Sequence, residues 1–173
     1  MAHDKIREKR IIKHYDEVQE ALCDEASDFA SIQLWQEFDR LPGLTPIEQL
    51  MFLELYAFVC RSLFGGIKLE VQKQLGKYRV DFLLTGFAPL LKDIVIECDG
   101  HDYHERTKEQ AKRDRVMDRE IQSLGYKIFR FTGSEIWKSP SDCVQCLYDE
   151  EDVLRQKKWR GELQFLGSNP IKL

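Results

Sequence analysis

Apolar residues recur at helical spacing along the start of the chain, and this spacing predicts helix over residues 4–40. After a break at residues 41–43, the pattern predicts a second helix from Pro46. Thr45 suits the position before that helix, and Glu48 follows three residues later, which is the spacing of a capping box. Because the second helix is rich in apolar residues, we expect it to be buried.

Short apolar runs bounded by glycine or proline follow, and they predict strands. The predicted strands are residues 67–73, 78–84, 93–98 and 127–131. The pattern also predicts a charged helix over residues 104–124, a short turn or helix start at 133–137, and a last helix over 139–159. Residues 161–173 receive no assignment. This order of elements predicts an α/β sandwich with a small mixed sheet.

Three carboxylates stand in or at the end of two neighbouring predicted strands. Asp81 lies inside the apolar run YRVDFLL, and Glu97 and Asp99 lie at the end of the run IVIECDG. Side chains alternate along a strand, so Glu97 and Asp99 point the same way. A carboxylate within a buried strand is costly unless a positive group meets it, and a shared divalent cation is the simplest partner. The alternative is that these carboxylates face solvent or pair with Arg79 and Arg130.

Two further kinds of side chain stand near these carboxylates in the sequence. Glu48 is a candidate third acid, although its spacing from Thr45 also fits a plain capping residue. His101 and His104 follow Gly100 in a predicted loop, where a histidine is suited to protonate a leaving oxygen or to position a water. The alternative is that both are exposed loop histidines.

Basic residues on the predicted helix 104–124 share one broad face, because they recur at a spacing of three and four. They are Lys108, Lys112, Arg115 and Arg119. Such a face is suited to contact phosphates. Acidic residues interleave with it, as on an ordinary solvated helix, so the charge pattern alone does not indicate nucleic-acid binding.

Cys143 and Cys146 form a CxxC pair, a spacing found in zinc and redox sites. Both fall on the apolar face of the last predicted helix, beside Leu147 and Leu154. The sequence has no second CxxC to complete a zinc site, and the strand–CxxC–helix context of redox proteins is missing. We therefore interpret both as buried free thiols.

The chain has 173 residues, the size of one domain, and a formal net charge of −4. This charge argues against a protein that coats nucleic acid, but a nuclease needs only a local basic surface. No apolar run is long enough to span a membrane, and the first residues lack the apolar core of a signal peptide. With five cysteines, an odd number, we expect a cytoplasmic protein with reduced thiols.

A series of short motifs, taken in order along the chain, resembles a known pattern. The series is Thr45-Pro-x-Glu48, Arg79-Val-Asp81-Phe, Ile96-Glu97-Cys-Asp99-Gly100, His104, Arg113-Asp114, Arg119, Leu124-Gly125-Tyr and Phe129-Arg130-Phe131. It is similar to the very-short-patch-repair-like (Vsr-like) branch of the PD-(D/E)XK nuclease superfamily, which has the restriction-endonuclease-like fold. Residues 45–137 would be the nuclease-like core, and residues 1–44 and 138–173 would be helical extensions of the same globular domain.

The resemblance implies a three-layer sandwich in which helices flank a four-stranded mixed sheet. It also implies that Asp81, Glu97 and the main-chain carbonyl of Cys98 bind Mg²⁺, for which Mn²⁺ can substitute. The other catalytic residues that it implies are Glu48, Asp99 and His104, with His101 as a further histidine at the same edge. Asp114 and Arg119 would tie their helix to the site or to the backbone.

One position departs from the superfamily pattern. A lysine usually stands two residues after the glutamate, and here that residue is Asp99. The lysine orients the attacking water and offsets developing charge. Lys108, Lys112 or a histidine would have to supply this role, and Asp99 would act as a ligand or position His104.

The resemblance implies a metal-dependent endonuclease that hydrolyses phosphodiester bonds in DNA through a metal-activated water. The basic face of helix 104–124 would then contact the DNA. RNA is an alternative substrate, and a catalytically weak nucleic-acid-binding or interaction module on the same fold is an alternative class. A double-strand cut by one site per chain would need two chains, so a homodimer is expected.

Overall fold

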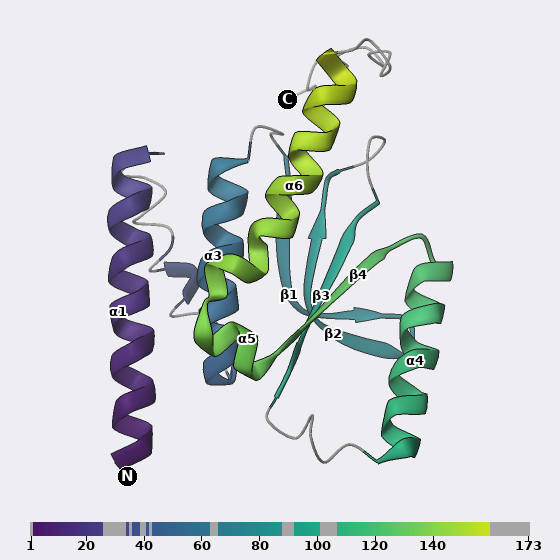
Figure 1. Cartoon of the computed structure of the whole chain (residues 1–173), viewed down its shortest axis with the longest axis horizontal. Coiled ribbons are helices and arrows are strands. Elements are labelled where there is room, and N and C mark those ends of the chain that lie inside the picture. Colours follow the sequence, from purple (N-terminus) through teal and green to yellow (C-terminus); the bar gives the residue numbers. More distant parts are fainter. Residues whose placement is uncertain are drawn as a thin grey trace.

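The computed structural model of the chain describes residues 2–25, 34, 36–38, 41, 43–62, 66–87, 92–100 and 107–159. In this part of the chain, helices flank both faces of a four-stranded mixed sheet (Figure 1). The helices are α1 (Ala2–Glu25), α3 (Pro46–Arg61), α4 (Lys108–Ser123), α5 (Gly133–Lys138) and α6 (Pro140–Trp159). The strands are β1 (Lys68–Leu75), β2 (Tyr78–Thr85), β3 (Ile94–Asp99) and β4 (Lys127–Thr132). The predicted α/β class and four-stranded mixed sheet are confirmed.

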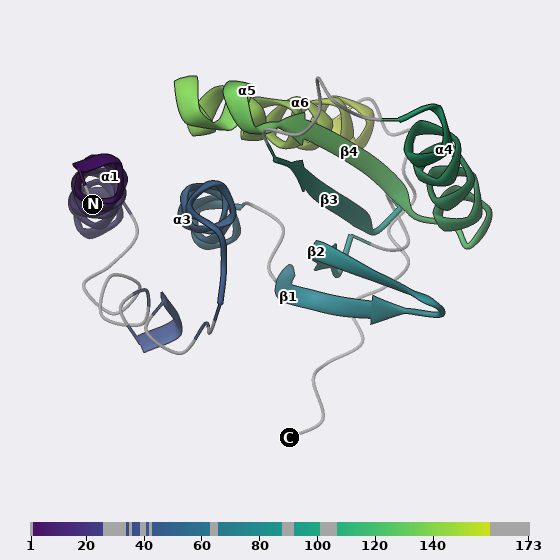
Figure 2. The ribbon, with the colours of Figure 1, turned by 90° about the horizontal axis from the view of Figure 1, so that it is seen from below.

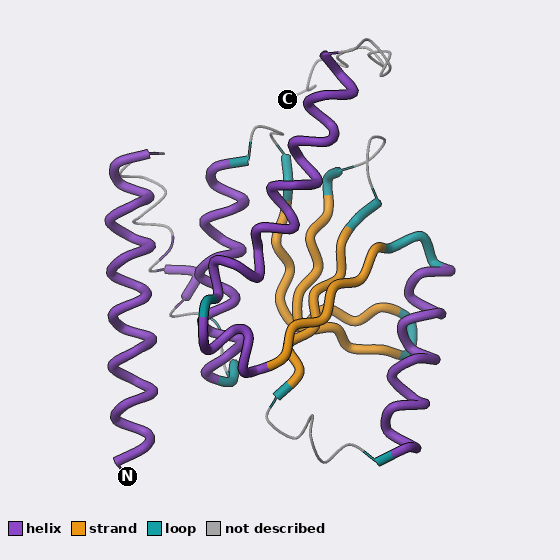
Figure 3. Tube along the Cα trace, viewed as in Figure 1, coloured by secondary structure: helices purple, strands orange, loops and turns teal. Residues whose placement is uncertain are grey.

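The strands lie in the order β1-β2-β3-β4, and the β1–β2 and β2–β3 pairs are antiparallel. β4 pairs with β3 in parallel, with α4 as the connection between them. Because β3 and β4 are parallel, both end at the same edge of the sheet (Figure 3). Residues that follow the ends of these strands are therefore brought together.

The pairing of β2 with β3 is short, and this opens the sheet at one end. The pairs run from Leu84–Ile94 to Phe82–Ile96, whereas β2 stays paired with β1 as far as Tyr78. Asp81 and Glu97 are the next residues of β2 and β3 beyond the last pair. The two strands separate where their carboxylates stand.

Each face of the sheet is buried against different helices. α3, α5 and α6 cover one face, where Phe58 packs with Phe82 and Ile96 in the larger core. α4 covers the other face through Ile121, which packs with Val95 of β3 (Figure 2). This arrangement makes the three layers that the resemblance implied.

The N-terminal helix α1 packs against α3 and lies beyond it as seen from the sheet (Figure 2). The prediction of helix over residues 4–40 is wrong in its continuity, because α1 ends at Glu25. The ring of Phe38 returns to lie 5.7 Å from the ring of Tyr15. A continuous helix would place these two residues about 35 Å apart. The contact between the two rings is tertiary, and no periodicity in the sequence encodes it.

Capping residues set where the other helices begin. Thr45 and Glu48 form the predicted capping box of α3. α4 begins at Lys108 because Thr107 caps it together with Gln110, and the predicted start at residue 104 lies outside the described residues. The expected turn at 133–137 is the short helix α5. Within the described part of the chain, no helix is long and apolar enough to cross a membrane.

Candidate active site

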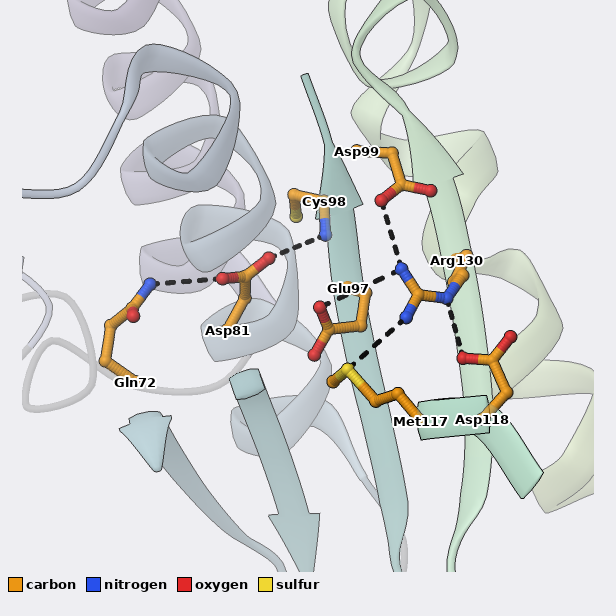
Figure 4. Close-up of polar contacts among 8 residues, drawn as sticks. All are labelled: Gln72, Asp81, Glu97, Cys98, Asp99, Met117, Asp118 and Arg130. Atoms are coloured by element: carbon orange, nitrogen blue, oxygen red, sulfur yellow. Dashed lines mark hydrogen bonds and ion pairs between the residues drawn. The ribbon is translucent and has the colours of Figure 1, made fainter. Parts of the chain in front are cut away.

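The side chain of Asp81 contacts the backbone of β3 at the point where the pairing of β2 with β3 ends. Its Oδ2 accepts a hydrogen bond of 2.8 Å from the backbone N–H of Cys98 (Figure 4). Burial raises the pKa of Asp81, the Cys98 hydrogen bond opposes this, and the nearby charge of Glu48 raises the pKa further. The carboxylate is therefore held against β3 and is half-buried.

Glu97 is a buried carboxylate with an unsatisfied oxygen. Its side chain is 13% exposed, and Oε2 lies 4.0 Å from Arg130 Nη1. Oε1 is buried and has no hydrogen-bond partner among the described residues. Burial, with a contribution from the charge of Asp81, raises the pKa of Glu97 to about 8. A buried acceptor without a donor is the state that a bound cation would relieve.

Glu48 is both the predicted cap and a neighbour of the strand carboxylates. Its Oε2 accepts a hydrogen bond of 2.6 Å from the backbone N–H of Thr45, which confirms the cap. Its Oε1 accepts a hydrogen bond of 2.8 Å from the amide of Gln72 on β1. The same amide nitrogen donates to Asp81 Oδ1 at 3.2 Å. Gln72 thus links the two acids, a contact that the sequence reasoning missed.

Arg130 forms the positive centre on the other side of Glu97 (Figure 4). It lies directly beside Glu97 in the β3–β4 register. Its Nη1 donates to Asp99 Oδ1 at 3.1 Å, and its Nε donates to Asp118 Oδ1 at 2.9 Å. These acids keep the pKa of Arg130 above its ordinary value although burial acts to lower it. The position that usually holds a lysine instead holds an acid that binds this arginine.

The link between α4 and the site differs from the one implied by the resemblance. Asp118 and Met117 make the contacts to Arg130, and Met117 accepts through its sulfur at 3.8 Å. Arg119 is exposed and Asp114 is half-buried. The contact of α4 with Arg130 is thus made by Asp118, the residue before Arg119.

A cavity of about 590 Å³ opens beside Asp81. The described residues that line it are Ile6, Arg7, Thr45, Pro46, Ile47, Glu48, Asp81, Cys98, Gly100 and Trp137. α1, α3 and α5 therefore all supply part of its wall. Side chains alternate along β3, so Cys98 faces this cavity and Glu97 points to the opposite face with Arg130. The carboxylate of Asp81 lies between the two.

The donor groups fit a hard divalent cation. Carboxylate and carbonyl oxygens are the ligands that Mg²⁺ prefers. No three acidic, cysteine or histidine side chains surround one point in the described part of the chain. The predicted set has two side chains, Asp81 and Glu97, and one main-chain carbonyl, that of Cys98. The unpartnered Oε1 of Glu97 is the observation that supports this set.

The remaining predicted site residues are two histidines and the basic residues of α4. His101 and His104 lie outside the described residues. Lys108, Lys112, Arg115 and Arg119 are all exposed along α4, as their spacing predicts. α4 lies across the sheet from α3, so the structure does not bring this basic face to the cavity (Figure 2).

Cys143 and Cys146 behave as packing residues. Their thiols donate to the backbone carbonyls of Ser139 and Cys143. Burial raises the pKa of Cys143 to about 12 and that of Cys146 to about 11, so both are protonated thiols. Both thiols are free, as predicted, but only Cys143 is buried and Cys146 is half-buried.

A mixed sheet with carboxylates where two central strands separate, enclosed by helices, defines a protein of the restriction-endonuclease-like class. The chain belongs to the REase_MTES_1575 family, whose model matches residues 57–150. Membership of this restriction-endonuclease-like family indicates a nuclease.

Two curated proteins from Haemophilus influenzae, each described as an uncharacterized protein, are similar to the chain. One is 26% identical over 95 residues, which is 55% of this chain and 73% of that protein. The other is 29% identical over 118 residues, which is 68% of this chain and 65% of that protein. No solved structure matches the chain significantly.

Proposed function

We propose that the protein is a Mg²⁺-dependent endonuclease that hydrolyses phosphodiester bonds in DNA. The observation that carries this proposal is the buried, unpartnered Oε1 of Glu97 beside the charge of Asp81. A buried pair of carboxylates is costly to retain unless a cation neutralises it. The family of the chain supports the reaction class. Asp99 followed by Gly100 after Glu97 supports placement in the Vsr-like branch.

Each residue of the site has a distinct part in this proposal. Asp81, Glu97 and the carbonyl of Cys98 hold the cation, which when bound would polarise a phosphoryl oxygen and acidify a water. Arg130 supplies the positive charge of the absent lysine, since its Nη1 lies 4.0 Å from Glu97 Oε2. Asp99 orients Arg130 through their hydrogen bond of 3.1 Å. His104 remains the proposed acid for the leaving oxygen.

The substrate contacts and the assembly are part of the same proposal. The exposed residues Lys108, Lys112, Arg115 and Arg119 would bind DNA phosphates away from the cavity. Because this face and the cavity lie on opposite sides of the sheet, one chain would contact DNA over two separate surfaces. One site per chain cuts one strand, so we propose a homodimer for cleavage of both strands.

A cleavage assay tests the proposed reaction. The substrates are supercoiled plasmid, single-stranded DNA and RNA, each with Mg²⁺, Mn²⁺ or EDTA. We expect cleavage of DNA that requires the metal and falls at least about 100-fold in Glu97→Gln. Glu70→Gln is the matched control, because Glu70 lies in the same sheet and pairs with Lys73 away from the site. Its activity should equal that of the native protein.

The other outcomes discriminate between the candidate functions. Cleavage of RNA alone would make the protein a ribonuclease. If the folded protein binds DNA but cuts nothing with either metal, the catalytically weak binding module is the better description. Asp99 at the lysine position is the observation that favours this second candidate.

A further inference from the structure

Gln72 has a backbone conformation that its residue type rarely adopts. Its φ is 51°, and it is the one residue other than glycine with a positive φ in the described part of the chain. It lies within β1, between Val71 and Lys73, which are paired with Phe82 and Val80 of β2. A side chain in the left-handed region costs free energy, and such positions persist where the surrounding structure requires them.

The side chain of Gln72 makes a specific pair of contacts from this position. Its Nε2 donates to Glu48 Oε1 at 2.8 Å and to Asp81 Oδ1 at 3.2 Å. An amide nitrogen carries two hydrogens, so it can serve both acceptors at once. The two acids come from different elements, α3 and β2. Gln72 therefore links α3 to the sheet at the site, and Figure 4 shows its contact with Asp81.

The remaining oxygen of each acid is held by the backbone. Glu48 Oε2 accepts from the N–H of Thr45, and Asp81 Oδ2 accepts from the N–H of Cys98. Both oxygens of each carboxylate thus accept a hydrogen bond, and the amide of Gln72 is the donor that the two carboxylates share. Without that amide, two like charges would face each other across a buried gap.

We propose that Gln72 is a positioning residue of the site, which holds Asp81 and Glu48 in the orientation that cation binding needs. The strained backbone is retained because it directs the amide to both acids. The cation part of this inference rests on the proposed function. The bridge between the two acids does not, because it is present without a cation.

Two substitutions separate the side chain from the backbone. Gln72→Met keeps the length of the side chain but cannot donate a hydrogen bond. Gln72→Gly removes the side chain and relieves the strain, since glycine adopts a φ of 51° readily. Gln74→Met is the matched control, because Gln74 is an exposed glutamine of the same strand that bonds only locally, to the carbonyl of Gly76. Thermal unfolding checks that all three variants are folded.

The first readout is cation affinity, measured by calorimetry with Mn²⁺ alone. Loss of a residue that orients metal ligands typically weakens binding by about 10- to 100-fold. We expect that loss in both Gln72 variants and native affinity in Gln74→Met. In the cleavage assay, kcat should fall in the Gln72 variants while KM for DNA stays unchanged. A Gln72→Gly protein with native Mn²⁺ affinity would overturn the proposal.

The second readout needs no metal and keeps the inference separable from the proposed function. It is hydrogen exchange of the Cys98 amide, followed by NMR in the presence of EDTA. If Gln72 holds Asp81 in place, the Cys98 N–H should exchange faster in both Gln72 variants than in Gln74→Met. Unchanged exchange would overturn the positioning role, whether or not the native protein binds metal or cuts DNA. Faster exchange in a protein that binds no Mn²⁺ would support the bridge and reject the endonuclease.

Discussion

The charge of Glu97 couples the candidate site to the stability of the metal-free protein. Burial raises its pKa in the folded state from 4.5 to about 8, so the folded protein binds this proton more tightly than the unfolded chain does. The stabilising contribution is therefore complete below pH 4.5 and is lost as the pH rises through about 8. Above that range the protein carries a largely buried charge that Arg130 offsets only in part.

Glu97→Gln should remove this dependence on pH. In EDTA at pH 9, we expect Glu97→Gln to be more stable than the native protein by about 2 kcal/mol or more, since one pKa unit corresponds to about 1.4 kcal/mol. At pH 4 the two should be nearly equal. Urea unfolding at both pH values gives the difference, and Glu70→Gln should show no such gain. A Glu97→Gln protein that is less stable than native at pH 9 would contradict the assignment of a buried charge.

The residues of the site differ in how visible they are in the sequence. Asp81 and Glu97 stand out because a charge within an apolar strand conflicts with burial, and that conflict can be read locally. Gln72 does not stand out, because a glutamine in a half-buried strand conflicts with no local rule. Its two acceptors come from α3 and β2, and their side chains meet the Gln72 amide only once helix and sheet have packed together. The role of Asp118 was not predicted for a similar reason, because its contact with Arg130 forms only in the tertiary structure.

Among the elements, α1 packs on α3 through apolar side chains of the larger core and through one close polar contact. His14 Nε2 lies 2.9 Å from Glu54 Oε1, and the two side chains are 15% and 11% exposed. Arg10 adds a hydrogen bond to the carbonyl of Trp137 and stacks over the Trp137 ring. These contacts fix α1 relative to both α3 and α5.

His14→Ala should destabilise the protein by about 2 kcal/mol, because it removes a largely buried side chain from the α1–α3 interface together with its polar contact to Glu54. Lys13→Ala is the neighbouring control, since Lys13 pairs with Glu17 at the exposed surface. That substitution should cost less than about 0.5 kcal/mol. Urea unfolding measures both values. Equal effects of the two variants would show that the His14–Glu54 pair does not hold α1 in place.

The elements were predictable where local signals define them. Thr45 with Glu48 indicated the start of α3, and short apolar runs bounded by glycine or proline indicated the strands to within a few residues. The end of α1 was not predictable, because helical spacing continues into the segment that carries Phe38. The contact of that ring with Tyr15 shows that the chain turns back, and a pattern along one segment cannot indicate which surface it meets.

For the whole molecule, the order of elements was enough to predict the class and the layers, because few arrangements bury these faces around one sheet. The relation between the basic face of α4 and the cavity was not predictable. Helical spacing defines a face but not the side of the sheet on which it lies. The structure places that face across the sheet from α3, so it and the cavity are separate surfaces.

The number of protein chains that bind one DNA duplex tests the proposed homodimer. We expect sedimentation of Glu97→Gln with a short DNA duplex and Mg²⁺ to show twice the 20.4 kDa of one chain bound to each duplex. The DNA-free protein is the control for self-association. One chain per duplex, together with nicking of plasmid by the native protein, would show that the proposed homodimer is wrong.

The wall that α1 contributes to the cavity has a consequence for how this family diversifies. Ile6 and Arg7 line the cavity, yet they lie outside residues 57–150, the part that the family model matches. The carboxylates of the two strands and the shape of the space beside them are therefore encoded in different parts of the gene. Exchange of the N-terminal segment between relatives would change which molecules enter the cavity and leave Asp81 and Glu97 untouched. Selectivity in such proteins can evolve, or be engineered, without rebuilding the reaction centre.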